Sequence, residues 1–531
     1  MKKNKALSCR LLSLATMIAV PLLAQAGTWQ PLNHQPPMPD IIDPQTGAFL
    51  CEGGAAFPML LTDGSVIVRN LNSQQFHGNA RVLKLTPDVN GSYRNGNWSE
   101  IASMPYITTA AAQAVLADGR VIVEGGEYTG VNENFTLTNQ GAIYDPVSNS
   151  WVSVAPPPFF VDLYPPRARF APNPIGDACS VVLPDGTFML QDKMSRQAAL
   201  LNLSTMTWTE TGTATKSDMN DEEGWTLLPN GKVLTVDCYA DFIFGLIPHY
   251  PPHPTNSEIY DPQTGTWASA GSTINTLTDR KTIETGPAVL RPDGTVFAVG
   301  SQGFTSIYHT NTGTWSVGPT LPEAPDGSRT TAGDAPGALL ANGNVLIAAT
   351  GGPFSGPPAY FFEFDGANVI REPATPNAAI DAAFSLNLLV LPTGEILETD
   401  GSKDIELYTP NITTHDPNWE PVVTNAPSTV SPGGSYTITG IRFNGMSQAS
   451  MYGDEGQNAT NYPLVRMTNL ATNHVFYSRT HNHSSMGVAS SAMVSTFFDV
   501  PLTQETGPSK LEVVANGIPS APVSVLVTSG H

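Results

Sequence analysis

The chain has 531 residues, of which 47 are glycine and 46 are proline, so residues that interrupt regular helices occur throughout. Charged residues make up 13% and hydrophobic residues 40%, which excludes a disordered chain, a coiled coil and a collagen. The formal net charge of -21 comes from 25 Lys and Arg against 46 Asp and Glu. Nucleic acid and anionic membrane surfaces are therefore not expected partners.

The first 26 residues have the pattern of a secretory signal. Basic residues within the first ten positions precede an apolar run, Leu11 to Leu23, and Ala24-Gln25-Ala26 follows. We predict cleavage after Ala26 and export to the periplasm or the extracellular space. An uncleaved anchor is the alternative, but Pro21 interrupts the short run. No later stretch reaches the ~18 apolar residues of a membrane span. We expect a monomer that is not an integral membrane protein.

Three cysteines remain after removal of Cys9 with the signal. They are Cys51, Cys179 and Cys238, and an odd number cannot all pair within one chain. Two interpretations stay open, namely three buried thiols or one disulfide with one free thiol.

A repeated hairpin organises most of the chain. Two apolar stretches flank a turn that ends in glycine, as in Leu-Leu-Thr-Asp-Gly64-Ser-Val-Ile-Val. Asp-Gly and Asn-Gly tolerate the positive φ of tight turns, and Val, Ile and Leu suit buried strands. The unit recurs with turns at Gly64, Gly119, Gly186, Gly231, Gly294, Gly343 and Gly394. A period of about 40 to 50 residues, lengthened by insertions, is typical of four-stranded propeller blades.

The outer half of the unit also repeats. Ile143 to Trp151, Ile259 to Trp267 and Ile307 to Trp315 are close copies, each a strand, a turn and a tryptophan. The seventh unit lacks this ending, but Gly27-Thr-Trp29 supplies it at the start of the mature chain. We therefore predict a seven-bladed propeller over 27–412, closed by the N-terminal strand.

The pattern changes at about residue 418. Alternating strands with Gly or Pro turns follow, among them Ser435-Tyr-Thr-Ile-Thr and Lys510-Leu-Glu-Val-Val. The 418–531 segment predicts a β-sandwich of immunoglobulin type. The predicted fold class is thus all-β.

This combination resembles the galactose oxidase and glyoxal oxidase family of secreted kelch-propeller proteins. The local matches are Tyr452-Gly-Asp-Glu-Gly-Gln457, Tyr462-Pro-Leu-Val-Arg466 and Arg479-Thr-His481. The resemblance implies one copper ion held by two tyrosines and two histidines, with one tyrosine joined to a cysteine as a radical cofactor.

The resemblance assigns positions to these ligands. His481 matches the C-terminal histidine on a loop that enters the propeller axis. Counting back from the turn glycines puts Phe384 and Ser385 where a Tyr-His pair belongs, and Ala55 and Ala110 where the cysteine and the cross-linked tyrosine belong. These residue types remove half of the copper shell.

An alternative interpretation retains a catalytic pair of one cysteine and one tyrosine. Cys51 and Tyr106 both lie thirteen positions before their turn glycines, so an equal shift in adjacent blades would bring them together. A rim cysteine and a loop tyrosine are the other interpretation.

Two further groups are candidate metal ligands. His481 and His483 would face the same side of a strand and could chelate a metal, or they belong to a polar network. An acidic series precedes the inner strands, where blade starts converge on one channel mouth, and would repel unless a cation such as calcium or backbone amides neutralise it. Its members are Asp177, Asp221, Glu222, Asp334 and Asp381.

Three functions remain open on the sequence. The first is an exported protein, divergent at the copper site, that binds a carbohydrate or another small extracellular ligand at the channel mouth. The second is a copper-radical oxidase that converts primary alcohols or aldehydes and releases hydrogen peroxide. The third is an interaction scaffold with an exposed apolar patch. Whether the chain is an enzyme stays undecided.

Overall fold

The structure is a computed structural model, and it describes residues 26–72, 77–132, 134–160, 173–238, 241–243, 247–249, 255–279, 284–352 and 356–529. Residues 1–25 of the expected signal peptide lie outside this range. In the described ranges, no helix has the length and hydropathy to cross a membrane.

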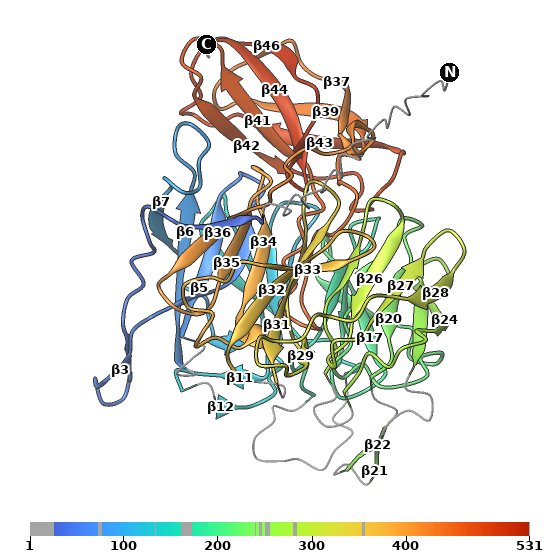
Figure 1. Ribbon diagram of the computed structural model, residues 1–531. Helices are drawn as coiled ribbons and strands as arrows, with labels where there is room; N and C mark the ends of the chain where they lie inside the picture. Colours follow the sequence, from blue (N-terminus) through green and yellow to red (C-terminus); the bar gives the residue numbers. More distant parts are fainter. Residues whose placement is uncertain are drawn as a thin grey trace, which may run out of the picture.

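Seven blades, each built on four successive antiparallel strands, surround a common axis in the described part of the chain (Figure 1). The strands of the first four blades follow, one blade at a time. They are β4 (Ala55–Leu60), β5 (Val66–Asn72), β6 (His77–Thr86) and β7 (Asn97–Ile101); β9 (Ala112–Val115), β10 (Val121–Glu124), β13 (Gly141–Asp145) and β14 (Ser150–Val154); β15 (Ser180–Val182), β16 (Phe188–Gln191), β17 (Ala198–Asn202) and β18 (Thr207–Thr211); β19 (Thr226–Leu227), β20 (Val233–Val236), β23 (Asn256–Asp261) and β24 (Thr266–Ser272). The others are β25 (Ala288–Leu290), β26 (Thr295–Val299), β27 (Thr305–His309) and β28 (Thr314–Val317); β30 (Gly337–Leu339), β31 (Val345–Gly351), β32 (Ala359–Phe364) and β33 (Val369–Glu372); β34 (Asn387–Val390), β35 (Ile396–Thr399), β36 (Ile405–Thr409) and β1 (Thr28–Pro31). The predicted all-β, seven-bladed propeller is confirmed.

The turn glycines have the backbone conformation that the hairpins require. All seven glycines named above have φ between 76° and 88°, in the left-handed region that residues with a Cβ avoid. The predicted turns, which end in Asp-Gly or Asn-Gly in six blades and in Thr393-Gly394 in the seventh, therefore join the two inner strands of every blade.

The seventh blade joins the two ends of the ring. β1 pairs antiparallel with β36, with Trp29 opposite Tyr408. The backbone N–H of Gly27 donates to Glu372 Oε2 at 2.8 Å, and the Trp29 ring lies 4.7 Å from that of Phe361 in the sixth blade. The N-terminal strand thus covers the edge that β36 would otherwise expose.

The repeated tryptophans tie neighbouring blades together. Trp151 in the second blade donates its indole N–H to Ala102 O behind the first blade, at 2.9 Å. Trp208 in the third blade donates to Ala155 O behind the second, at 2.7 Å. Trp29 donates in the same way to Pro373 O behind the sixth blade. The sequence repeat therefore encodes a repeated contact between blades.

The C-terminal strands form a separate β-structure over one face of the propeller (Figure 1). They are β37 (Val422–Asn425), β38 (Thr429–Val430), β39 (Ser435–Ile441), β41 (Leu464–Asn469), β42 (Val475–His481), β43 (Met493–Asp499), β44 (Gly507–Ala515), β45 (Ile518–Pro519) and β46 (Val523–Val527). A core that includes Ile438, Met467 and Phe498 packs between them. The immunoglobulin-type topology stays a prediction.

This β-structure covers the face with the hairpin turns. Thr480 N donates to Thr62 O at 3.1 Å, and His483 N donates to Ala117 O at 2.8 Å, beside the turns of the first two blades. The blade starts that precede the inner strands consequently lie at the opposite mouth of the channel.

Residues 448–458 enter the axis and reach that opposite mouth. β40 (Ser450–Met451) pairs with β30, and Gly456 N donates to Ala111 O at 3.0 Å. The carbonyl oxygen of Gly453 would lie 2.2 Å from a Cβ added at Gly224, so this approach requires glycine. The segment contacts inner strands around the ring and fills the channel.

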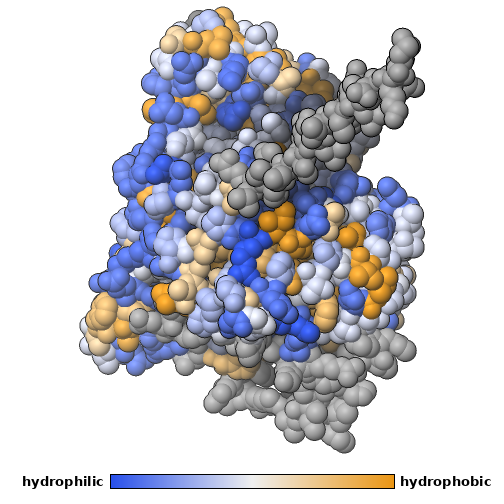
Figure 2. Space-filling model, viewed as in Figure 1, coloured by the Kyte–Doolittle hydropathy of each residue, from blue (hydrophilic) through white to orange (hydrophobic). Residues whose placement is uncertain are grey.

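Short elements complete the described structure. They are β2 (Ile41–Ile42), β3 (Phe49–Cys51), β8 (Thr108–Thr109), β11 (Tyr128–Thr129), β12 (Asn134–Phe135), β21 (Asp241–Ile243), β22 (Ile247–His249), β29 (Thr330–Thr331), η1 (Ala383–Ser385) and η2 (Pro417–Trp419). On the face seen in Figure 2, hydrophobic residues form small groups between hydrophilic ones. This face therefore gives no support to the interaction-scaffold hypothesis.

Candidate functional site

A cavity of about 330 Å³ lies at the channel mouth away from the C-terminal β-structure. Carboxylates supply much of its lining, from Glu127, Asp177, Glu222, Glu284, Asp334 and Glu455. Four aromatic side chains, Phe57, Tyr128, Phe384 and Tyr452, complete the wall. The cavity therefore combines hydrogen-bond acceptors with flat apolar surfaces, the mixture typical of small-molecule sites.

The blade register places the acidic residues at equivalent points around the axis. Asp177, Glu222 and Asp334 each stand nine positions before the turn glycine of their blade. Glu222 and Asp334 have φ of 60° and 49°, in the left-handed region that costs non-glycine residues about 1–3 kcal/mol. Ala110 and Phe57, also on the cavity wall, share this conformation with φ of 48° and 51°. Four non-glycine residues on the cavity wall thus have a left-handed backbone.

One lysine neutralises part of the acidic lining. The ammonium of Lys193, which follows β16, lies 2.5 Å from Asp177 Oδ1, 2.7 Å from Asp221 Oδ1 and 2.6 Å from Glu222 Oε1. Burial raises the pKa of Asp221 to about 8, although Lys193 opposes the shift. Burial also acts to raise the pKa of Glu222, but the Lys193 charge and hydrogen bonds with Glu284, Lys193 and Asp221 together outweigh it, and the pKa is lowered. Glu222 is therefore the carboxylate that Lys193 keeps ionised.

A second group of carboxylates at the cavity is formed by Glu284, Asp334, Asp454 and Glu455. One oxygen each of Asp334, Asp454 and Glu455 lie within 4.8 Å of one another, and the same holds for Glu222, Glu284 and Asp334. Burial, and then repulsion from Asp334, raises the pKa of Glu284 well above its usual range. Burial raises the pKa of Glu455 to about 8. This group thus favours bound protons or a bound cation.

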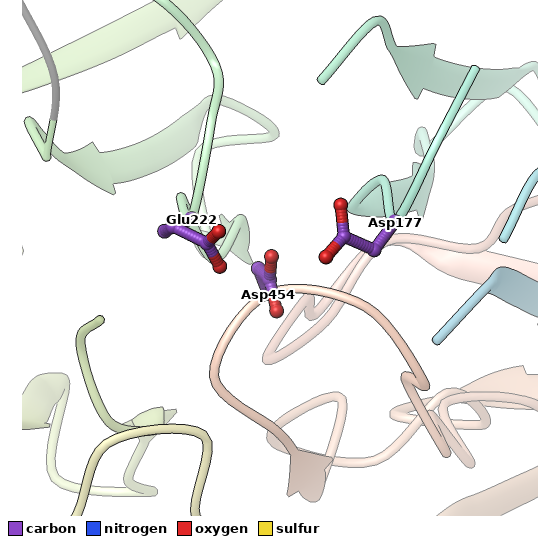
Figure 3. Close-up of side chains that lie close together, drawn as sticks. All are labelled: Asp177, Glu222 and Asp454. Atoms are coloured by element: carbon purple, nitrogen blue, oxygen red, sulfur yellow. The ribbon is translucent and has the colours of Figure 1, made fainter. Parts of the chain in front are cut away.

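Asp454 stands between the two groups. Figure 3 shows its carboxylate between those of Glu222 and Asp177, with which it forms a further set of oxygens within 4.8 Å. Asp454 is only 1% exposed, and neither of its carboxylate oxygens accepts a hydrogen bond. Burial, followed by repulsion from Glu455, raises its pKa well above the usual range. The Lys193 charge offsets this rise only in part, so a buried carboxylate of this kind is costly without a proton or a further cation.

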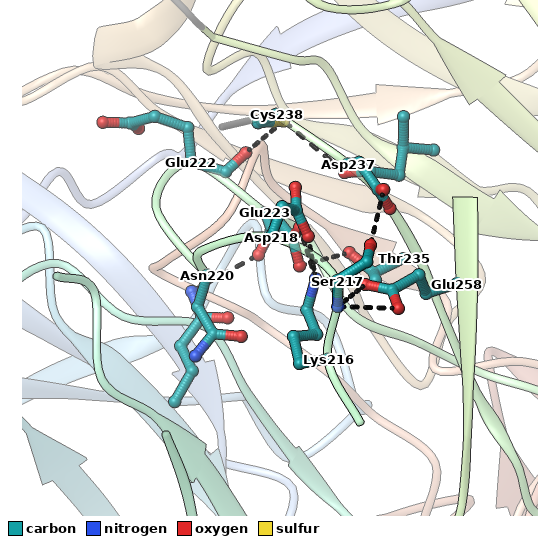
Figure 4. Close-up of polar contacts among 12 residues, drawn as sticks. Lys216, Ser217, Asp218, Asn220, Glu222, Glu223, Thr235, Asp237, Cys238 and Glu258 are labelled. Carbon is teal, nitrogen blue, oxygen red and sulfur yellow. Dashed lines mark hydrogen bonds and ion pairs between the residues drawn. The ribbon is translucent and has the colours of Figure 1, made fainter. Parts of the chain in front are cut away.

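A separate ionic network lies inside the fourth blade, around Lys216 (Figure 4). The buried Lys216 ammonium contacts Asp218, lies 2.9 Å from Glu223 Oε1 and lies 2.7 Å from Glu258 Oε2. Ser217 Oγ donates to Asp237 Oδ2 at 3.2 Å, and Thr235 Oγ1 donates to Glu223 Oε2 at 3.0 Å. Burial raises the pKa of Asp218 to about 6 and that of Asp237 to about 7. This network has its own cation and does not line the cavity.

The structure brings four of the five predicted acidic residues together. Asp177, Asp221, Glu222 and Asp334 meet at the cavity or at Lys193. Asp381 is buried elsewhere, in the seventh blade, where its charge raises the pKa of Glu398. The turn and short helix η1 between Asp381 and β34 move it out of register with the other blade starts.

The histidines lie at the C-terminal β-structure and not at the cavity. His481 Nε2 lies 3.2 Å from Asp499 Oδ1, and its ring stacks on Phe497. His483 Nδ1 lies 2.9 Å from Thr496 Oγ1, and burial lowers its pKa to about 3. We expected the His481 loop to enter the axis, but residues 448–458 occupy that place because β42 ends on the hairpin-turn face.

Cys51 and Tyr106 lie away from the cavity as well. Cys51 is at the end of β3, which pairs with β2 outside the blades, whereas the Tyr106 hydroxyl donates to Val123 O at 3.1 Å. Cys51, Cys179 and Cys238 are buried thiols that form no disulfide within the described residues. Burial raises the pKa of Cys179 and Cys238 well above the usual range, so neither is an activated nucleophile.

The donor set of the cavity does not fit the expected copper centre. Its lining contains no histidine and no cysteine among the described residues, and Phe384, Ser385 and Ala110 occupy the positions assigned to ligands. Of its two phenols, that of Tyr452 donates to Phe384 O. Carboxylate oxygens are ligands for hard cations such as Ca²⁺, whereas the copper centre requires imidazole and phenolate.

Sequence reasoning missed five residues of the site, namely Glu127, Lys193, Glu284, Asp454 and Glu455. The nine-position register, applied to every blade, would have pointed to Thr285 and so to Glu284 next to it. Asp454 and Glu455 lie in a motif that carried the family resemblance, but nothing in the sequence indicated that this segment enters the axis. Glu127 and Lys193 follow second strands, where no repeat pattern marked them.

Fold and site together define a seven-bladed β-propeller protein whose open mouth is an acidic cavity. The resemblance to the galactose oxidase and glyoxal oxidase family is confirmed at the level of the fold, since the strand pairing forms the propeller that it implied. No protein-family model matches the chain, and no curated protein does.

Several solved structures are similar to the chain. A fungal alcohol oxidase of the AA5 family in complex with copper is 15% identical, with a TM-score of 0.47 over 95% of this chain and 100% of that one. YjhT is 14% identical, with a TM-score of 0.37 over 60% and 97% of the two chains. YCF48 from Cyanidioschyzon merolae is 10% identical, with a TM-score of 0.39 over 73% and 100%.

Proposed function

We propose that this is an exported, monomeric propeller protein that binds a carbohydrate or another small extracellular ligand in the mouth cavity. The observation that carries the proposal is the cavity itself, about 330 Å³ lined by carboxylates and aromatic rings. Carboxylates accept hydrogen bonds from sugar hydroxyls, and aromatic faces pack against the apolar faces of sugar rings. The hydroxyl groups of a sugar would therefore bind to the carboxylates, and its apolar faces would pack against the aromatic rings.

The proposal places no copper-radical chemistry in this cavity. A phenolate and imidazole shell would need donors where Phe384 and Ser385 lie, and a thioether would need Cys51 beside Tyr106. The copper-radical oxidase remains the alternative that the family resemblance offers, and a hard cation such as calcium is the metal that the carboxylates would suit.

The test is a ligand screen on the mature protein together with a variant whose cavity is filled. Ser385 lies on the cavity wall in η1 and contributes no carboxylate. We expect at least one neutral or charged monosaccharide or disaccharide to raise the melting temperature of the native protein. Ser385→Trp should remove that shift by occupying the cavity. Val152→Trp, on an exposed strand position, is the matched control and should keep it.

Two outcomes would contradict the proposal. One is a ligand panel in which no compound changes the melting temperature, and the other is a shift that survives in Ser385→Trp. A parallel peroxide assay with copper-loaded protein and simple primary alcohols should give no hydrogen peroxide. Peroxide production at the rate of a working oxidase would favour the alternative.

A further inference from the structure

Two carboxylate clusters near the channel already hold ammonium groups. Lys193 Nζ lies 2.5–2.7 Å from three carboxylate oxygens, and Lys216 Nζ is surrounded in the same way by Asp218, Glu223 and Glu258. The Lys216 ammonium also lies 5.3 Å from the centre of the Trp267 ring. Three carboxylates are thus this chain's own arrangement around an ammonium, and at Lys216 an aromatic ring joins them.

The third cluster has the carboxylates but no lysine. Across the part of the chain that the structure describes, no lysine or arginine forms an ion pair with Glu284, Asp334, Asp454 or Glu455. Both Asp454 oxygens and Glu284 Oε2 are buried without a hydrogen-bond partner. These atoms therefore identify the place where a positive charge from outside the chain would be stabilised.

The surroundings select an organic cation over a bare metal ion. The cavity of about 330 Å³ is roughly ten times the volume of one water molecule. Its walls include Phe57, Phe384 and Tyr452, which supply aromatic surface and no further metal donors besides one phenol. An organic cation would use both the carboxylates and the aromatic faces.

We propose that the ligand carries a primary ammonium group, as an amino sugar does, and that this group binds among Glu284, Asp334 and Glu455 above Asp454. The inference rests on the proposed function and names the chemical class of its ligand. The ammonium would take the place in this cluster that lysine side chains take in the other two. The rest of the ligand would lie against Phe57 and Phe384.

Calorimetry with glucosamine and glucose tests the inference, because the two sugars differ in one group. At pH 7 we expect the protein to bind glucosamine at least tenfold more tightly than glucose, since a hydrogen bond between charged groups is the stronger kind. The diamine 1,4-diaminobutane should compete with glucosamine. Glu284→Gln should weaken glucosamine binding at least tenfold and leave glucose binding within twofold, whereas Asp326→Asn, an exposed acid, should change neither.

The contrary results distinguish failure of the ammonium inference from failure of the proposed function. Equal affinity for glucose and glucosamine, with both lost in Ser385→Trp, would overturn the ammonium inference and leave the cavity function standing. Binding of Ca²⁺ at the cavity without competition by 1,4-diaminobutane would replace the organic cation with a metal. Failure of glucosamine and of the diamine to bind would overturn the inference, and an empty ligand screen would overturn the proposed function as well.

Discussion

The mouth cavity and the fourth-blade network meet at three consecutive acidic residues. The two regions differ in how their buried carboxylates are neutralised. Asp221 and Glu222 contact Lys193 at the cavity, whereas the next residue, Glu223, turns inward to Lys216. The left-handed φ of Glu222 accompanies this change of direction. A sulfur contact, from Cys238 Sγ to Glu222 O at 3.1 Å, links the two regions.

The difference lies in which carboxylates have a counter-ion within the chain. The network around Lys216 is closed, because its cation and its hydrogen-bond donors come from the fourth blade itself. The cavity is open, and Lys193 reaches only part of its acidic lining. Buried charge that is neutralised internally stabilises structure, whereas buried charge that is left over indicates a ligand.

The largest effect is expected from removing the cation of the closed network. Lys216→Met leaves the carboxylates of Asp218, Glu223 and Glu258 without their partner, and should reduce the free energy of unfolding by about 3–5 kcal/mol. Lys193→Met should cost less, about 1–3 kcal/mol, because water and protons can enter the cavity. Urea denaturation measures both values.

The matched control for these two variants is Lys232→Met, since Lys232 forms an exposed ion pair with Asp261. It should leave the unfolding transition unchanged. If Lys216→Met were as stable as the control, the closed network would not be what holds this part of the blade.

The next effect is a fall in stability as the pH rises. Burial raises the pKa of Asp218 to about 6 and of Asp237 to about 7, from 3.8, so between pH 4 and 7 the folded state binds more protons than the unfolded state. The contribution of these two groups to stability is then greatest near pH 4 and decreases until about pH 7. Lys216 and Glu223 belong to the same network. The pKa of each is raised, and neither shift reverses this decrease of stability with rising pH.

Differential scanning calorimetry at pH 5, 6, 7 and 8 follows this dependence. Asp237→Asn, which cannot ionise, should flatten it, and Asp326→Asn should reproduce the native curve. A melting temperature that rises over this range would show that these carboxyl groups are ionised in the folded protein.

The smallest effect is expected at the acid that the structure separates from the cavity. Asp381→Asn should leave ligand binding within twofold of the native value, because Asp381 does not line the cavity. Asp334→Asn should weaken binding at least tenfold. Equal losses in the two variants, measured by calorimetry on folded protein, would mean that the cavity extends to Asp381.

The repeat allowed the fold to be predicted from the sequence. Turn glycines such as Gly64 and Gly394 mark the hairpins, and tryptophans such as Trp151 mark the blade ends, because each has a local physical reason to recur. The position of the acids before the inner strands also predicted that Asp177, Glu222 and Asp334 would converge. It failed at Asp381, where an intervening turn shifts the chain.

The rest of the site depends on long-range placement that no local pattern encodes. Asp454 reaches the mouth because residues 448–458 cross the propeller, and His481 stays behind because β42 ends at the other face. Lys193 follows an inner-blade strand that the turn pattern located, but only the folded ring puts its ammonium beside Glu222. Contacts between distant segments decided which acids were neutralised.

The central claim is that the cavity carboxylates without a lysine receive their positive charge from a ligand. A crystal structure of the mature protein with glucosamine tests it most directly. The account predicts the sugar nitrogen within hydrogen-bond distance of Glu284, Asp334 and Glu455, with the sugar ring against the aromatic wall and Lys216 unchanged. A metal ion in that position, or a sugar bound only outside the cavity, would contradict it.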